Sequence, residues 1–297
     1  MLALDTTGTV LLNAAAGIAQ SLIPQSPQHT VCTTTLTPGL ALVPDVVLGA
    51  AAFGGNCRYY AWSFAGSAPA IVDSAPIGEG FAVAYVGPNR WIINTKHETW
   101  AMTDTSSTSL GYLEEPNEFV ADPAGRYLVP TFSSTSDTAG IPVYSTATST
   151  IAYHIAGQTH IGGAGFSSDG DTLFVDGPDL LALDAATGRV LMQAPSEGFD
   201  WSYMILVPNS PWIYLVPDTP IDVPGSFSGV AGFAVIDRRT LATVAHVEVP
   251  PATPEPFKFD DITFPALGTD NTLYVVDIHA WRDVPGPTRI YAFDLLP

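Results

Sequence analysis

The sequence predicts an all-β fold, a β-propeller of four-stranded blades, from three observations. Short apolar strands alternate with turns rich in Gly, Pro, Asn and Asp, and no segment of ten or more residues carries a convincing helical period. The stretch "GFSSDGDTLFVDGPDLLALDAATGRVLMQ", residues 165–193, has the pattern of four consecutive strands. Its tail recurs at residues 1–13 as "MLALDTTGTVLLN", and a β-sandwich would not repeat every forty-odd residues.

Two landmarks set the order of the repeated units along residues 1–297, which we expect to form a single propeller domain. The first is a turn between two apolar strands, found near Asp45, Asn89, Gly125, Gly170, Asn209 and Asp270. The second is an alternating third strand, which ends near Gly66, Asp104, Ser145, Asp184, Asp237 and Asp294. Each third strand follows its turn in step, so six blades are expected.

The two ends of the sequence predict how the ring closes. The last unit ends with its third strand, "RIYAFDLLP", whereas residues 8–13, "GTVLLN", form a fourth strand without a blade. Pairing residues 8–13 with the blade of residues 257–297 would remove an exposed strand edge. Residues 1–5, "MLALD", are a seventh copy of the third strand: they either pack beside the closing strand or belong to a seven-bladed ring that begins upstream of residue 1. Length favours six blades.

Composition narrows the classes of partner. Ten Lys and Arg residues against 29 Asp and Glu residues give a net charge of −19, so no basic surface is expected for nucleic acid. The longest early stretch without charge, "TTGTVLLNAAAGIAQSLIPQSPQ", is interrupted by Asn, Gln, Ser and Pro and follows no Lys or Arg, so we expect neither a membrane span nor a signal peptide there. The low Lys content slightly favours an extracytoplasmic (periplasmic or secreted) setting. Cys32 and Cys57 are either a disulfide across one repeat or two buried thiols.

The unit "FSSDGDTLFV" followed by "LLALDAATGRVL" resembles the superfamily of bacterial propellers that includes YVTN-repeat, quinoprotein-like and lactonase-like domains. Within it, "IGEGFAV" with Glu79 and "LYVVDIHAWRDVPGPTRIYAFDL" with Asp277 are similar to the gluconolactonase and senescence-marker family. That resemblance implies a six-bladed, metal-dependent lactonase in which Glu79 is a metal ligand.

The residues themselves predict a polar site at one end of the central channel. The innermost strand of each blade should begin there, and counting back from the turns reaches those beginnings. The count gives Thr35, Glu79, Glu118, His160, Asp200 and Asp261. Five of these six are titratable, although only 13% of the chain is charged. The facing loops could add Asn56, His97, Asp137, Asp176, Asp218, Asp277 and His279.

Carboxylates that converge on one axis repel one another unless a cation offsets their charge. We therefore expect Glu79, Glu118, Asp200 and Asp261 to hold a divalent cation, Ca²⁺ or Mn²⁺. Such an ion would polarise a carbonyl group and lower the pKa of a water molecule. Asp200 and His160 are then the candidate catalytic residues. The candidate substrate contacts are His97, Trp201, Asp277, His279 and Trp281.

The predicted function is the binding of a small polar organic molecule at this channel mouth, with lactonase-like hydrolysis as the reaction if the protein is an enzyme. Two alternatives stay open, since fold alone does not fix function. One is a non-catalytic scaffold that binds a protein or peptide, and the other is a glycan-binding propeller. Polar residues at strand starts can also do no more than solvate the channel mouth.

Overall fold

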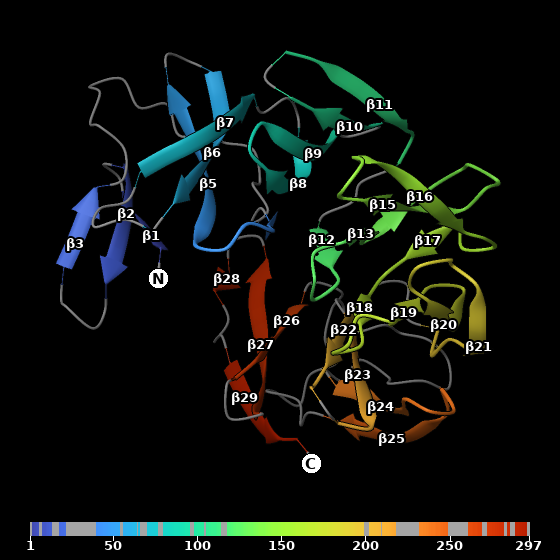
Figure 1. Cartoon of the computed structure of the whole chain (residues 1–297). Coiled ribbons are helices and arrows are strands. Elements are labelled where there is room, and N and C mark those ends of the chain that lie inside the picture. The colour runs from blue at the N-terminus through green and yellow to red at the C-terminus, as the bar shows by residue number, and fades with distance from the viewer. Residues whose placement is uncertain are drawn as a thin grey trace. The chain divides into compact units, whose positions relative to one another are not determined.

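The computed structural model describes most of the chain, and strands account for its regular structure (Figure 1). No helix within the described residues is long and apolar enough to cross a membrane. The residues described are 2–5, 8–13, 18–21, 40–53, 56–63, 65, 70–76, 80–95, 98–103, 105–113, 118–198, 202–208, 210–217, 232–248, 261–268, 272–281, 284–285 and 289–295.

The chain divides into two compact units. The first comprises residues 1–119 and 148–150, and the second comprises residues 120–147 and 151–297. The expectation of one propeller domain stays a prediction.

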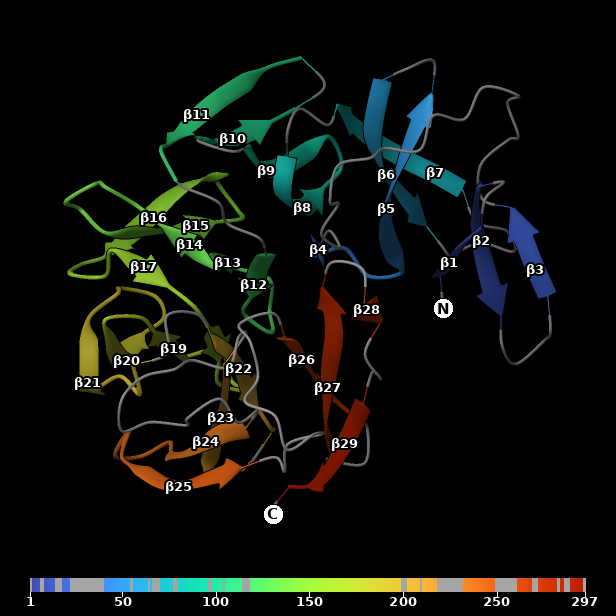
Figure 2. The ribbon, with the colours of Figure 1, turned by 180° about the vertical axis from the view of Figure 1, so that it is seen from behind.

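The first unit contains three sheets (Figure 2). One has the order β1-β2-β3, the next β5-β6-β7, and in the third β4 pairs parallel with β8, which continues antiparallel into β9, β10 and β11. The strands are β1 (Leu2–Asp5), β2 (Gly8–Asn13), β3 (Ile18–Ser21), β4 (Leu40–Ala41), β5 (Val46–Phe53), β6 (Asn56–Ser63), β7 (Ala70–Pro76), β8 (Gly80–Gly87), β9 (Arg90–Thr95), β10 (Glu98–Met102) and β11 (Ser107–Gly111).

The closing role predicted for residues 8–13 is wrong. These residues form β2, which is the central strand of its sheet. One edge of β2 pairs with β1, with Leu2 opposite Leu11, and the other edge pairs with β3, with Asn13 opposite Ile18. Because both edges are occupied, β2 has no free edge with which to complete the last blade. The tight hairpins on either side of β2 explain the outcome, since local pairing closes a much shorter loop. The number of blades stays a prediction.

The second unit contains four-stranded sheets in chain order, β12-β13-β15-β16, β18-β19-β20-β21 and β22-β23-β24-β25, and a last sheet in which β27 pairs with β26, β28 and β29. A short sheet pairs β14, which lies between β13 and β15 in sequence, with β17, which lies between β16 and β18. The strands are β12 (Glu118–Ala121), β13 (Tyr127–Thr131), β14 (Ser133–Ser134), β15 (Ile141–Ser145), β16 (Thr150–Ile155), β17 (His160–Ile161), β18 (Ala164–Phe166), β19 (Thr172–Asp176), β20 (Asp179–Asp184), β21 (Val190–Pro195), β22 (Ser202–Leu206), β23 (Trp212–Pro217), β24 (Gly232–Asp237), β25 (Thr243–Glu248), β26 (Asp261–Leu267), β27 (Thr272–Trp281), β28 (Val284–Pro285) and β29 (Arg289–Asp294).

The predicted turns and strand ends fit these sheets. Asn89, Gly125 and Gly170 lie in turns between paired strands and have positive φ angles of 55°, 68° and 76°. Asn and Gly are the residues that adopt this conformation at little cost. The predicted ends of the third strands are confirmed where β15, β20, β24 and β29 end, at Ser145, Asp184, Asp237 and Asp294.

Aspartate at the end of a third strand shapes the turn that follows it. The Asp184 carboxylate accepts hydrogen bonds from the backbone N–H groups of Ala186 and Thr187, at 3.2 and 2.9 Å, and from the Thr187 hydroxyl at 2.8 Å. The Asp237 carboxylate likewise accepts a hydrogen bond from the backbone N–H of Arg239 at 2.7 Å. These carboxylates stabilise the turn by accepting its backbone N–H groups, as Asp side chains commonly do.

Neighbouring sheets of the second unit share their apolar cores. Phe174 and Leu180 of one sheet pack with Ile213 and Leu215 of the next, and all four side chains are buried. The other face of that second sheet packs in turn on the last sheet, where Leu273 is buried. The middle strands β20 and β23 are therefore buried along nearly their whole length, and their sequences are almost continuously apolar.

Outer strands follow a different pattern. In β21 the side chains are exposed or half-buried throughout, and in β16 they alternate. Val190 and Val244, on the outer strands β21 and β25, are about half exposed. This difference between middle and outer strands is the one that stacked blades require.

Candidate functional site

We call the end of the blades at which β18, β22 and β26 begin the mouth end, and the opposite end the far end. The sequence predicts functional residues at the mouth end. Glu118 begins β12 and Asp261 begins β26, each the first strand of its sheet, as predicted. His160 instead begins β17, a two-residue strand that pairs with β14, while the first strand of the next sheet, β18, begins at Ala164. Glu118 and His160 are half-buried. Glu79, His97, Asp200 and Trp201 lie outside the described residues, as does Cys32, so the disulfide also stays a prediction.

The last sheet brings several predicted residues into one register. In the antiparallel pair of β26 and β27, Asp261 lies directly opposite His279 and Thr263 lies opposite Asp277. Trp281, further along β27, pairs with Val284 of β28. Opposite residues of an antiparallel pair lie on the same face of the sheet. Asp261 and His279 therefore occupy opposite backbone positions at the mouth end of this sheet.

No metal centre is complete in the part of the chain that the structure describes. Among those side chains, no group of three or more His, Cys, Asp or Glu residues could hold an ion. Asp200 and Glu79 lie outside that part, and Asp261 is described by its backbone. The predicted cation site therefore stays a prediction.

A buried carboxylate, Asp176, is the centre of the best-defined polar cluster at the mouth end. Asp176 is the last residue of β19 and is 1% exposed. One carboxylate oxygen accepts a hydrogen bond from the Ser196 hydroxyl at 2.8 Å, and the other accepts one from the Ser202 hydroxyl at 2.5 Å. Its backbone is bonded to Gly162 and Gly163. The side chain thus joins β19 to the segment after β21 and to the first residue of β22.

Burial has a direct electrostatic consequence for this group. Removal from water disfavours the ionised form and raises the pKa of the Asp176 carboxyl to about 6. The hydrogen bonds from Ser202 and Ser196 act in the opposite direction and lower the pKa, while the negative charge of Glu197 adds to the rise. A carboxyl in this position is held between neutral and ionised forms near pH 6.

Glu197, which follows β21, contacts the outer strand of the next blade. Its carboxylate accepts a hydrogen bond from the Thr243 hydroxyl, and its second oxygen lies 2.6 Å from Nε2 of His246. Both partners belong to the outer strand β25. Nothing in the sequence pattern identifies Glu197 as the partner of His246.

Glycines allow the strands to approach closely at this end. A Cβ atom on Gly163 would lie 2.8 Å from the Met204 backbone nitrogen and 2.9 Å from the Ser202 carbonyl oxygen. A Cβ atom on Gly177 would lie 2.5 Å from the His160 carbonyl oxygen. Real Cβ contacts are not this short, so only glycine fits at these two positions.

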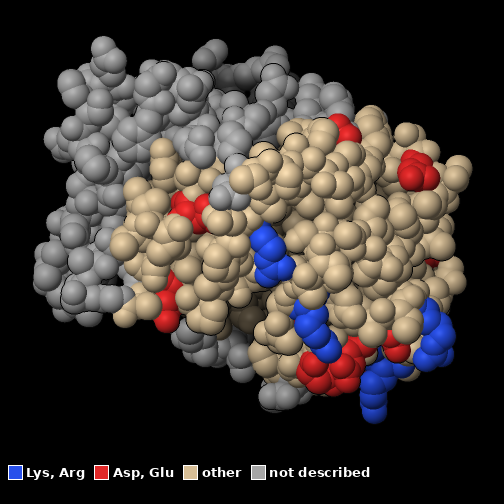
Figure 3. All heavy atoms as spheres, turned by 45° about the horizontal axis from the view of Figure 1, so that its top comes forward, with Lys and Arg blue, Asp and Glu red and all other residues tan. Residues whose placement is uncertain are grey.

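Charge is unevenly distributed over the three sheets from β12 to β25. Of the side chains described there, no Lys or Arg lies at the mouth end, where Asp137, Asp176, Asp179 and Glu197 are found. The arginines described between β12 and β25 lie at the far end, at positions 126, 189, 238 and 239. Acids accompany them there: on the face that Figure 3 presents, Lys and Arg side chains lie beside Asp and Glu side chains.

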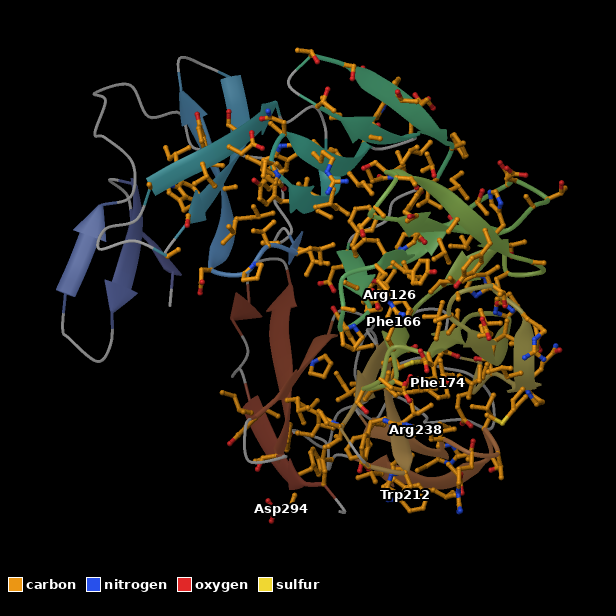
Figure 4. The ribbon with its side chains drawn as sticks, viewed as in Figure 1. Arg126, Phe166, Phe174, Trp212, Arg238 and Asp294 are labelled. Atoms are coloured by element: carbon orange, nitrogen blue, oxygen red, sulfur yellow. The ribbon has the colours of Figure 1, made fainter. Side chains whose placement is uncertain are left out.

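Two of these arginines hold blades together. The Arg126 guanidinium is 2.7 Å from the Asp122 carboxylate and donates a hydrogen bond to the Gly170 carbonyl oxygen of the next sheet at 2.9 Å. Arg238 lies over the Phe174 ring, 5.8 Å from its centroid, and donates to the Val207 carbonyl oxygen at 3.2 Å (Figure 4). These two guanidinium groups at the far end therefore contact groups of the protein itself.

The predicted site and the observed cluster overlap in part. Asp176 was among the loop residues that the sequence placed near the mouth, and the structure makes it the centre of the described cluster. Ser196, Ser202 and Glu197 carried no signal, because their partners are 20, 26 and 46 to 49 residues away in the sequence.

Comparison with known proteins finds likeness in structure. No protein-family model matches the chain, and no curated protein matches it. The WD40 domain of Toxoplasma gondii coronin is similar, with a TM-score of 0.55, 13% identity and coverage of 86% of this chain and 69% of that one. Hydrazine synthase of Kuenenia stuttgartiensis is similar, with a TM-score of 0.52, 13% identity and coverage of 85% and 79%. WD40 domains are β-propellers, and together with the all-β sheets described above this likeness gives the chain a β-propeller fold.

Proposed function

We propose that this propeller is a binding scaffold that takes a positively charged segment of a protein or peptide at the mouth end of its second unit. The uneven distribution of charge carries this proposal. Between β12 and β25 the described acids of the mouth end have no Lys or Arg side chain beside them, whereas those of the far end do. An acidic surface without counter-charges attracts cations and steers them towards it. The net charge of −19 extends that attraction over the whole chain.

The geometry of the mouth supports binding more than chemistry at Asp176. Both oxygens of this acid are engaged by serine hydroxyls, and the side chain is buried, so its contacts are those of a structural group. Asp137, another acid of the mouth end, is exposed. Its carboxylate shapes its own loop by accepting a hydrogen bond from the Ala139 N–H at 2.9 Å. Loops fixed in this way lose little conformational entropy when a partner binds.

Charge substitution tests the proposal. Replacing Asp137, which is exposed, and Asp179, which is half-buried, with Asn should weaken binding of fluorescent decalysine by roughly tenfold at low salt, because each charge at the surface contributes up to about 1 kcal/mol. Fluorescence anisotropy gives the affinity, and raising the ionic strength should reduce it further. The matched control is the double variant Asp171→Asn and Asp294→Asn, which removes the same charge from exposed positions at the far end. Equal losses in the two double variants would contradict a site at the mouth end.

The register of the last sheet favours a second candidate, a divalent-cation site that serves a small polar ligand. Asp261 and His279 occupy opposite positions at the mouth end of β26 and β27. A carboxylate there, with Asp200 and Glu79, would supply the oxygen ligands that Ca²⁺ or Mn²⁺ takes. The reaction to assay is then lactone hydrolysis, with Asp200 and His160 as the acid–base candidates.

Metal addition tests this second candidate. Ca²⁺ or Mn²⁺ should raise the melting temperature, because an ion at a hundred times its Kd stabilises the native state by about 2.7 kcal/mol. The gain should vanish in Asp261→Asn and persist in Asp294→Asn, which removes an equal charge at the far end. A melting curve that neither metal moves would rule the site out.

A further inference from the structure

We propose that Thr131, Phe132 and Ser133 form a closed binding site at the mouth end. The hydroxyl groups of Thr131 and Ser133 take one ammonium or guanidinium group of a basic partner when the Phe132 ring moves aside. This site rests on the proposed binding function and adds to it the contact that a single cationic side chain makes. Two unpaired buried hydroxyl groups, a strained backbone between them and the charge of the surroundings support it.

The site lies where β13 passes into the short strand β14. Thr131 is the last residue of β13, and Ser133 is the first residue of β14, which pairs with β17. The backbone N–H of Phe132 donates a hydrogen bond to the Gly162 carbonyl oxygen at 3.0 Å. The Phe132 ring packs on the ring of Tyr203, the second residue of β22, with 4.6 Å between the centroids. Segments of different sheets therefore meet here, at the end where β22 begins.

Both hydroxyl groups of the site are buried and have no hydrogen-bond partner among the described residues. Thr131 is 2% exposed and Ser133 is 0% exposed. The side-chain oxygen of Gln158, on the segment that leads into β17, is buried and unpaired in the same way. An unpaired polar group in the interior destabilises a fold, because its bonds to water are lost and not replaced. Each of these oxygens can accept a hydrogen bond from an N–H group of a partner.

The backbone between the two hydroxyl groups is strained. Phe132 has a φ of +50°, which a bulky side chain adopts only at a cost. Such conformations persist where the surrounding structure imposes them, and they are concentrated at functional sites. Because the two hydroxyl groups are closed off from solvent, a partner reaches them only if the chain between them moves. Phe132 is the residue whose movement costs least, since its closed conformation is already unfavourable.

The surroundings of the site favour a cationic group. The buried acid Asp176 is linked to the same turn, since its carbonyl oxygen accepts a hydrogen bond from the Gly162 N–H at 3.0 Å. Between β12 and β25, no Lys or Arg side chain is described at the mouth end. The rings of Phe132 and Tyr203 offer faces that attract a cation. An ammonium or guanidinium group therefore suits the site, because it brings both N–H donors and positive charge.

Substitution of the two hydroxyl groups separates a binding site from a structural role. Thr131→Val and Ser133→Ala should each weaken decalysine binding by roughly threefold or more, measured by fluorescence anisotropy. Each should also raise the melting temperature by about 2 °C, because an unpaired buried hydroxyl group is removed. A residue that only stabilised the fold would not change affinity and stability in opposite directions. The matched control is Ser149→Ala, which removes a buried, unpaired hydroxyl from the turn between β15 and β16 and should leave the affinity within about twofold of wild type.

Phe132→Gly tests the movement of the ring. Glycine adopts a positive φ without strain and has no ring to displace, so this variant should bind decalysine about threefold more tightly than wild type. Adding Ser133→Ala should abolish the gain. If Phe132→Gly does not fold, Phe132→Asn takes its place, because Asn tolerates this conformation. A variant without the ring that binds no more tightly would show that Phe132 does not cover the site.

Two results would overturn the site as a whole. One is an unchanged affinity in both Thr131→Val and Ser133→Ala when the wild type binds decalysine. The other is a melting temperature that falls in both variants, which would show that the hydroxyl groups have partners in the folded protein. Failure of the wild type to bind decalysine would instead refute the proposed function, and with it the cationic ligand of this site.

Discussion

Gly140→Ala should destabilise the second unit by about 3 to 5 kcal/mol, the sum of backbone strain and overpacking. Gly140 precedes β15 and has a φ of +96°, a conformation that side chains rarely adopt. A Cβ atom there would lie 2.1 Å from the carbonyl oxygen of Ile155, the last residue of β16. That oxygen belongs to the backbone of a paired strand, so it cannot move aside without breaking the sheet.

Gly157→Ala is the matched control for this prediction. Gly157 also has a positive φ, +78°, but a Cβ atom there would meet nothing within 4 Å. This variant should lose only the conformational cost, about 1 to 2 kcal/mol. Urea denaturation of the two variants measures the difference between them. If both lose the same stability, the close approach of Gly140 to Ile155 is not a feature of the folded protein.

The contribution of Asp176 to the free energy of unfolding should fall as pH rises from about 4 to 7. Its carboxyl has a pKa of about 6 in the fold, against 3.8 for the free side chain. Between these values the folded state keeps a proton that the unfolded state has released, so raising the pH favours unfolding. Two pKa units correspond to about 3 kcal/mol of stability, which is fully present below pH 4 and fully lost above pH 6.

Asp176→Asn isolates this contribution, because the amide does not titrate. Relative to wild type, the variant should gain stability steadily between pH 4 and 6 and keep the gain at pH 7, up to about 3 kcal/mol. Thermal melts of both proteins across this range provide the comparison. A difference that does not change with pH would show that Asp176 titrates as an ordinary exposed acid.

The strand pattern was predictable from sequence because each blade is made of local contacts. Turns at Asn89, Gly125 and Gly170 and strand ends at Asp184 and Asp237 depend on residues a few positions apart. The closing strand was not predictable in the same way. The hairpins of β2 with β1 and β3 compete with a pairing across the whole chain, and sequence repetition alone does not decide between them.

The functional cluster was predictable only where a residue type carried the signal. Asp176 was predicted to lie near the channel mouth because it is an acid in a loop facing it. Nothing in the sequence distinguishes Ser196 and Ser202 from other serines. Their role arises from burial and from the meeting of two blades, which depend on tertiary packing. The predictions for Glu79, Asp200 and Asp261 as cation ligands rest on strand-start counting and await the experiments above.

The shared cores of the second unit also bear on how such a chain grows in evolution. Because Phe174 and Leu180 pack with Ile213 and Leu215, the apolar face of each sheet is covered by its neighbour. Duplicating one sheet therefore adds a sheet whose apolar face also covers that of its neighbour. Losing one sheet exposes the apolar faces of the two sheets on either side of it. Gain of a repeat is tolerated more easily than deletion, and drift in turns and outer strands leaves the shared faces intact. A lineage can thus erase the likeness between its repeats while the architecture persists.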